Sequence, residues 1–151
     1  MNPVTTRLRV RYGETDAMGV VYYANYLTYF EVGRTDFFKA MGLDYAHLED
    51  QGILAPCVEA SCRYRSPARY AQELLLTTTL TAMPGVRLVF DYRLDHAASG
   101  AVLATGRTVH ACVDRAGRPL ALKKKHPQAW TLLQQALHEV KHGDCPPGGG
   151  R

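Results

Sequence analysis

The sequence predicts one α+β domain, in which a five-stranded, mostly antiparallel sheet wraps around a single long helix. Two observations support this fold class. One long segment repeats its apolar residues at helical spacing, and one segment before it and four after it have the apolar or alternating patterns of strands. The helix is apolar over a wide arc, so the sheet must curl around it to bury that surface. The 151 residues are enough for one hydrophobic core.

The first two elements are a strand over residues 6–12 and the long helix. The strand alternates apolar side chains with arginines. The helix begins near Ala24 and ends at Gly42, because aromatic and small residues recur between them every three or four positions. Gly33 lies inside this helix at a cost of about 1 kcal/mol relative to alanine, so we expect the sheet to pack closely there. Asp44 is expected to cap a short second helix.

Four strands joined by hairpins are predicted to follow, and a last helix ends the domain. The strands are placed at residues 53–65, 73–82, 86–95 and 101–114, and the helix at residues 127–142. The run Lys123-Lys124-Lys125-His126 is interpreted as a solvated loop rather than a binding patch. A single sheet leaves its edges open, and edge-to-edge pairing of two copies closes one of them, so we expect at least a dimer. The domain is placed at residues 1–142, followed by a disordered tail at 143–151.

Composition excludes several classes of protein. The net charge of +4 is too weak and too dispersed to indicate nucleic-acid binding. No apolar run is long enough to span a membrane, so membrane insertion is not expected. The N-terminus lacks the apolar core of a signal peptide, which predicts a cytoplasmic protein. The four cysteines are too poorly placed for a disulfide framework.

The strongest chemical signal is the segment from Tyr12 to Thr35, YGETDAMGVVYYANYLTYFEVGRT. It places Asp16 in a short turn before the start of the long helix. A helix N-terminus offers unpaired N–H groups and about half a positive charge, and an ionised aspartate is a base or nucleophile. Together they predict attack on a carbonyl group. The alternative is that Asp16 only closes a turn with its own backbone.

A second motif indicates different chemistry. Residues 138–142 read His-Glu-Val-Lys-His, which fits the H-E-x-x-H pattern of zinc peptidases. Only nine residues follow, without a clear segment for a third ligand, so we interpret the match as fortuitous and predict no metal. Glu31 and Arg34, three apart on the long helix, are expected to form an ion pair, although a catalytic role for Glu31 stays open.

With its elements in this order, the sequence resembles the hotdog-fold thioesterases of the 4-hydroxybenzoyl-CoA thioesterase and Tol-Pal-associated acyl-CoA thioesterase type. The resemblance extends from Arg7 to about Leu120. It is carried by the motifs at residues 12–16, 19–23, 25–26, 31–35, 65–70, 106–108 and 113–115.

This resemblance implies roles for particular residues. Asp16 matches the catalytic aspartate, and Tyr23 occupies the position whose backbone N–H polarises the thioester carbonyl. The active site of such proteins lies at a subunit interface, and tetramers built from two dimers are common, so a homotetramer is among the expectations. The remaining candidates are substrate-binding residues: Gly19, Val20, Tyr22, Tyr26 and Arg87.

Several of these candidates have a simpler interpretation. Gly19 is equally well explained as a turn glycine, and Tyr26 is better explained by packing. Arg63, Arg65, Arg69 and Arg87 suit the phosphates of coenzyme A, but they suit solvated strand ends equally well. Relatives often carry histidine where this chain has Tyr23, so only a role of the backbone N–H carries over.

The sequence therefore predicts an acyl-CoA thioesterase that needs no cofactor, with acyl-CoA as its substrate and a homo-oligomer, either a dimer or a dimer of dimers, as its assembly. Two alternatives from other classes stay open. One is a non-catalytic protein of the same fold that binds acyl thioesters. The other is a zinc-dependent peptidase acting through His138 and His142. The acyl group, the choice between coenzyme A and acyl carrier protein, and the choice between nucleophilic and general-base chemistry are open.

Overall fold

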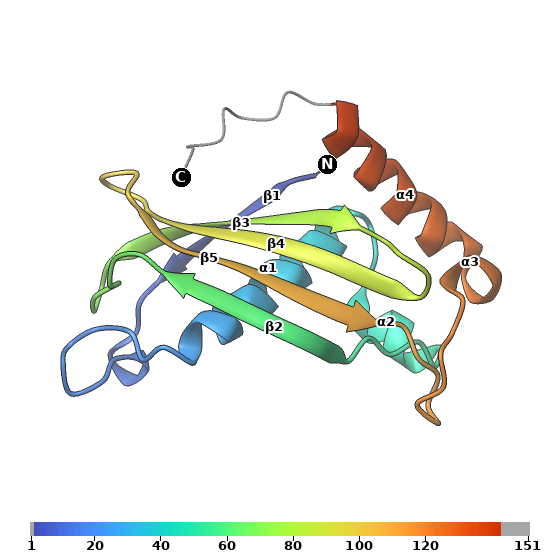
Figure 1. The fold of residues 1–151 in the computed structure, drawn as a ribbon, viewed down its shortest axis with the longest axis horizontal. Coiled ribbons are helices and arrows are strands. Elements are labelled where there is room, and N and C mark those ends of the chain that lie inside the picture. Colours follow the sequence, from blue (N-terminus) through green and yellow to red (C-terminus); the bar gives the residue numbers. More distant parts are fainter. Residues whose placement is uncertain (1, 143–151) are drawn as a thin grey trace.

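The structure is a computed structural model that describes residues 2–142, so the predicted tail at residues 143–151 lies outside the described residues. It shows a five-stranded sheet curled around one central helix, α1 (Figure 1). In chain order the elements are β1 (Val4–Arg9), the 3₁₀ helix η1 (Tyr12–Glu14), α1 (Asn25–Ala40), α2 (Tyr45–Asp50), β2 (Cys57–Tyr64), β3 (Glu73–Ala82), β4 (Arg87–His96), β5 (Val102–Ala111), α3 (Leu122–Lys125) and α4 (Pro127–His142). The predicted α+β class and central helix are confirmed.

The strand order in the sheet is β1-β3-β4-β5-β2, and all four neighbouring pairs are antiparallel. The prediction that hairpins join all four of the later strands was wrong for β2, which pairs with β5 at the far edge and not with β3. Alternation along a strand indicates which face is buried, but not which strand lies beside it. The two edge strands are therefore β1 and β2.

The core lies between α1 and the concave face of the sheet. The helix contributes a buried stripe that includes Tyr26, Phe30 and Phe37. The Phe30 ring stacks on Tyr92 of β4, with ring centroids 4.2 Å apart and planes 7° from parallel. Gly33 faces the sheet so closely that a methyl group there would clash with the side chains of β3. The expected close packing at Gly33 is thus confirmed.

Several predicted elements differ from the structure in their bounds or type. The first strand ends at Arg9 rather than at residue 12, because the Glu14 carboxylate accepts the Arg11 N–H at 2.7 Å and starts η1. The strand predicted from residue 53 begins only at Cys57, after a proline that has no N–H to pair. The supposed lysine loop is the helical turn α3, in which the Lys125 N–H donates to the Ala121 carbonyl at 3.0 Å.

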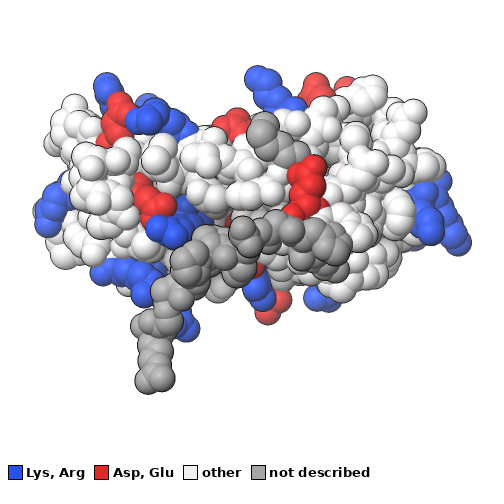
Figure 2. Space-filling view, turned by 90° about the horizontal axis from the view of Figure 1, so that it is seen from above, with Lys and Arg blue, Asp and Glu red and all other residues white. Residues whose placement is uncertain are grey.

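The second helix follows its prediction, because the Asp44 carboxylate accepts the Ala46 N–H at 3.0 Å as an N-cap. Among the described residues, no helix is long and apolar enough to cross a membrane. Figure 2 shows basic and acidic side chains interspersed on one face of the molecule, with no continuous basic surface. This distribution agrees with the weak net charge.

Candidate active site

Asp16 lies at the first corner of a tight loop just before α1. Thr15 and Val21 pair across the base of this loop, and the Asp16 N–H donates to the Val20 carbonyl at 2.9 Å. The Gly19 N–H donates a hydrogen bond to the Asp16 carbonyl, also at 2.9 Å. Gly19 has φ +74°, a conformation that glycine adopts without strain. The loop thus uses Gly19 as a turn residue, and close approach of a ligand there stays a prediction.

The two oxygens of the Asp16 carboxylate have different surroundings. Oδ1 accepts the Met18 N–H at 2.8 Å, which is the turn-closing role considered above. Among the described residues, Oδ2 has no hydrogen-bond partner. Because the residue is half-buried rather than enclosed, this second oxygen is available to a ligand or a water molecule.

Glu14 joins this loop to α1, a role that the sequence reasoning did not assign. Its carbonyl accepts both the Tyr22 N–H and the side-chain amide of Asn25 at 2.9 Å. Its carboxylate accepts the Tyr29 hydroxyl at 3.0 Å. Burial, together with the negative charge of Glu14, raises the pKa of Tyr29, so the phenol stays a proton donor. The signal in the sequence was present, since Glu14 and Asn25 both belong to the recognised motifs.

The start of α1 presents free backbone donors. The Asn25 N–H donates to the Tyr22 carbonyl at 2.9 Å, whereas the N–H groups of Tyr23 and Ala24 have no acceptor among the described residues. The side chain of Tyr23 is largely exposed, at 61%. Two unpaired N–H groups at the positive end of a 16-residue helix favour a negative charge there.

The other substrate-binding candidates near this loop fall into two groups. Val20 and Tyr22 line the loop, with Val20 paired to Arg69 and the Tyr22 ring 4.6 Å from that of Tyr23. Tyr26 is buried, at 3% exposed, and its hydroxyl accepts the Ala68 N–H at 3.3 Å. Packing therefore explains Tyr26 in the isolated chain, as the sequence favoured.

Arg87 lies at the opposite end of the sheet from Asp16. Arg9, at the end of β1 that leads to the Asp16 loop, pairs with Glu73 at the start of β3, while Arg87 follows the turn after the end of β3. The ten residues of β3 separate these ends by about 30 Å. Arg87 can therefore serve the Asp16 site only from a second subunit, whereas Arg69 lies beside the loop of its own chain.

A cavity of about 170 Å³ lies further along α1. Its lining residues are Glu31, Arg34, Thr35, Phe38, Tyr45, Ala55 and His110. Among the described residues, no ion pair links Glu31 to Arg34, so that prediction was wrong. Arg34 instead donates to the Tyr92 hydroxyl at 3.0 Å, because the fold brings β4 within reach of its guanidinium. Glu31 lines the cavity, and its carboxylate has no partner within the described part of the chain.

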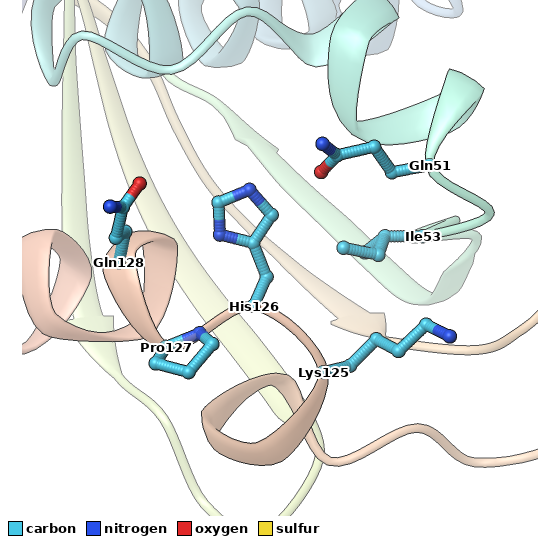
Figure 3. Close-up of a pocket in the computed structure, with 6 residues that line it drawn as sticks. All are labelled: Gln51, Ile53, Lys125, His126, Pro127 and Gln128. Carbon is cyan, nitrogen blue, oxygen red and sulfur yellow. The ribbon is translucent and has the colours of Figure 1, made fainter.

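A wider cavity of about 610 Å³ opens between the end of α2 and the start of α4 (Figure 3). Its lining residues are Gln51, Ile53, Lys125, His126, Pro127 and Gln128. This set contains no carboxylate or thiol, and His126 Nδ1 already accepts the Ala129 N–H at 3.1 Å. The cavity therefore offers no carboxylate base like that of Asp16.

The structure does not test the H-E-x-x-H motif. His138 and Glu139 lie near the end of α4, but the side chain of His142 is outside the described part of the chain. Among the described residues, no three His, Cys, Asp or Glu side chains gather closely enough to hold a metal ion.

Comparisons with known proteins identify a family, similar sequences and similar structures. Residues 10–137 match the model of the Thioesterase-like superfamily. The Bacillus subtilis (strain 168) protein YneP, provisionally named an acyl-CoA thioesterase, is 35% identical over 85% of this chain and 94% of its own. The 1,4-dihydroxy-2-naphthoyl-CoA hydrolase of Synechococcus elongatus is 30% identical over 82% of this chain and 91% of its own. The crystal structure of DHNA-CoA thioesterase from Staphylococcus aureus matches with a TM-score of 0.91 at 28% identity, covering 97% of this chain and 98% of that chain.

Proposed function

The chain belongs to the thioesterase-like superfamily and is a hotdog-fold thioester hydrolase, and we propose that it cleaves acyl-CoA with Asp16 as the acting carboxylate. One observation supports this assignment above the others. A half-buried carboxylate with one unpartnered oxygen lies in the loop that leads into two free N–H groups at the start of α1. These are a base or nucleophile and an oxyanion donor within one short segment.

The proposed chemistry has two steps at the thioester carbonyl. In the general-base form, Asp16 takes a proton from water as the water oxygen adds to the carbonyl carbon. The Tyr23 N–H then stabilises the oxyanion until the C–S bond breaks and coenzyme A leaves as its thiolate. In the nucleophilic form, Oδ2 of Asp16 attacks the carbonyl carbon and the C–S bond breaks, so that coenzyme A leaves as its thiolate. Water then hydrolyses the resulting anhydride, which releases the acid and restores Asp16. The hydrogen bond from Met18 to Oδ1 orients the carboxylate in either form.

The substrate and the assembly extend this proposal. Acyl-CoA is the proposed substrate, in line with the names of the relatives, and an aromatic acyl group is one candidate because of the naphthoyl-CoA hydrolase among them. The active unit is proposed to be a cytoplasmic homo-oligomer, either a dimer or a dimer of dimers. A second subunit is also what would bring Arg87 to a coenzyme A molecule bound near Asp16.

The test is a substrate panel run on the wild type and Asp16→Asn, with release of free thiol as the measurement. Asparagine keeps an oxygen for the Met18 N–H, so the turn survives while the charge and the base are lost. We expect kcat to fall by about 100-fold to 10,000-fold, the usual contribution of a general base. Short-chain, long-chain and aromatic acyl-CoAs, including 1,4-dihydroxy-2-naphthoyl-CoA, form the panel.

Asp114→Asn is the matched control. Asp114 also closes a turn, since its Oδ1 accepts the Ala116 and Arg118 N–H groups at 2.9 Å, but it lies in the turn after β5. This control should retain wild-type turnover. Turnover that is indifferent to Asp16 would contradict the assigned site. If no substrate releases thiol, an acyl-thioester binding protein is favoured. If the activity disappears with a chelator and in His138→Ala, the zinc peptidase is favoured.

A further inference from the structure

Two successive peptide N–H groups, and not one, are free at the start of α1. Neither the Tyr23 N–H nor the Ala24 N–H has an acceptor among the described residues, and the next N–H, of Asn25, is already bonded. Ala24 is helical, with φ −68° and ψ −23°. Its N–H therefore points out of the helix start, like the other unpaired donors of a first turn.

A side chain from the edge of the sheet holds the peptide between Tyr23 and Ala24. Tyr64, the last residue of β2, donates its hydroxyl to the Tyr23 carbonyl at 2.9 Å. That carbonyl belongs to the same planar peptide unit as the Ala24 N–H. A hydrogen bond accepted by the carbonyl fixes the plane of the unit and strengthens its N–H as a donor, because linked hydrogen bonds polarise one another.

The packing around Tyr64 keeps this phenol in place. Its ring meets the Tyr26 ring edge to face, with centroids 4.9 Å apart and planes at 87°. Tyr26 is itself fixed in the core by burial and by the Ala68 N–H. Partial burial, helped by Cys62, raises the pKa of Tyr64 to about 12, so the hydroxyl keeps its proton throughout the neutral range.

We infer that the Ala24 N–H is a second oxyanion donor beside that of Tyr23, and that Tyr64 is a positioning residue that orients and polarises it. This inference rests on the proposed thioester hydrolysis. The oxyanion gains charge only as the tetrahedral intermediate forms, so a stronger donor favours that state over the bound substrate. Tyr64 acts through the peptide and does not touch the substrate.

The first test compares Tyr64→Phe with the wild type on an acyl-CoA that the wild type hydrolyses. Phenylalanine keeps the ring against Tyr26 and removes only the hydroxyl. We expect kcat to fall about tenfold with KM within twofold, because the donor is weakened and not removed. The matched control is Tyr70→Phe, since Tyr70 is an exposed tyrosine whose hydroxyl makes no hydrogen bond among the described residues. Its turnover should equal that of the wild type.

A spectroscopic measurement separates polarisation from a general structural effect. In the slow Asp16→Asn background, the carbonyl stretching band of bound acyl-CoA should shift to lower frequency relative to free substrate. Adding Tyr64→Phe should reduce that shift, and adding Tyr70→Phe should not. A destabilised but intact site would not move the band in this selective way.

Ala24→Pro removes the second donor, but proline at this position of the turn closed by the Asn25 N–H and the Tyr22 carbonyl also strains Tyr23, so this variant supplements the Tyr64→Phe test. The φ of Ala24 already matches that of proline, and its N–H has no partner to lose. We expect a fall in kcat of about 100-fold or more, the effect of removing an oxyanion donor. Circular dichroism and the unfolding midpoint check that the helix is retained, and Tyr64→Phe carries the test if this proline variant does not fold.

The outcomes separate the two proposals. If the wild type is active, Asp16→Asn is inactive and Tyr64→Phe matches the wild type in both kcat and the carbonyl band, the inference is wrong and the proposed function stands. The inference is also overturned if Tyr64→Phe lowers kcat and at the same time lowers the molecular mass in solution or the unfolding midpoint. A wild type that hydrolyses no thioester overturns the proposed function, and the inference falls with it.

Discussion

The two oxygen atoms of the Asp16 carboxylate have different surroundings. Oδ1 closes the loop through the Met18 N–H, whereas Oδ2 has no partner in the described part of the chain and is the atom proposed to react. The turn-closing and catalytic interpretations of the residue are therefore compatible. Glu14 supports both tasks, because its carbonyl ties the loop to Tyr22 and Asn25 at the helix start.

The polar residues behind the 170 Å³ cavity form a hydrogen-bond chain with one consistent direction. His110 Nδ1 lies 3.0 Å from the Ala55 carbonyl, so that nitrogen must carry the proton. Nε2 then accepts from the Thr108 hydroxyl at 2.9 Å, and Thr108 accepts from Tyr92 at 2.6 Å. The Arg34 guanidinium completes the chain by donating to Tyr92. Protonation of His110 would turn Nε2 into a donor and break this order.

This arrangement predicts a stability that falls with acidification. Burial lowers the pKa of His110 in the folded chain below the value of about 6.5 expected when unfolded. Well above pH 6.5 the histidine is neutral in both states and adds no pH dependence. Below about pH 6.5 the unfolded state takes up a proton that the folded state refuses, so the free energy of unfolding decreases.

Denaturant unfolding at several pH values between 7 and 5 measures this effect. The free energy of unfolding should decrease less steeply with falling pH in His110→Gln, which cannot titrate, than in the wild type. The control is His47→Gln, since His47 is an exposed histidine of α2, and it should keep the wild-type slope. Equal slopes in His110→Gln and the wild type would contradict the assignment.

Among the elements, α1 both fills the core and supplies the site. The same helix buries its aromatic stripe against the sheet and presents its N-terminus to the Asp16 loop. Because the sheet must approach α1 closely, two glycines lie at the contact. A methyl group on Gly33 would clash with Thr78 and Leu76, and one on Gly106 would clash with the Phe30 ring.

Gly33→Ala is therefore expected to destabilise the protein, although alanine is the better helix former. The gain in helix propensity is about 1 kcal/mol, and overpacking a core contact typically costs about 1–3 kcal/mol. Gly13→Ala is the matched control, because nothing lies within 4 Å of the added methyl group. Urea unfolding should show a lower midpoint for Gly33→Ala alone, and an unchanged midpoint would show that the contact relaxes freely.

At the scale of the whole molecule, β2 is the more exposed of the two edge strands. Seven of its eight residues are exposed and one is half-buried. Val58, at 51% exposed, is apolar, as is Val32 on the exposed side of α1. An exposed edge strand with apolar neighbours is a template for pairing with another strand. A second copy of the chain is the expected partner, in keeping with the family resemblance.

We expect light scattering to give a mass at least twice the 16.8 kDa of one chain. Val58→Asp should lower that mass and, with it, the thioesterase activity, because a charge would be placed at the pairing edge. Leu132→Asp is the control, an exposed apolar residue on α4, and should change neither. A monomeric and fully active wild type would contradict both the edge pairing and a site completed by a second subunit.

The sequence by itself determined the class of the fold, the position of the central helix, the cap at Asp44 and the carboxylate at the helix start. These features depend on residues close together in the chain, where periodicity, turn residues and capping act locally. The tertiary structure decided the rest. Three of these features depend on residues distant in sequence. They are the pairing of β2 with β5, the hydrogen bond of Arg34 to Tyr92 rather than to Glu31, and the distance between Arg87 and Asp16. Local patterns indicate which face of an element is buried, but only the packing of the whole chain determines which side chains meet across it.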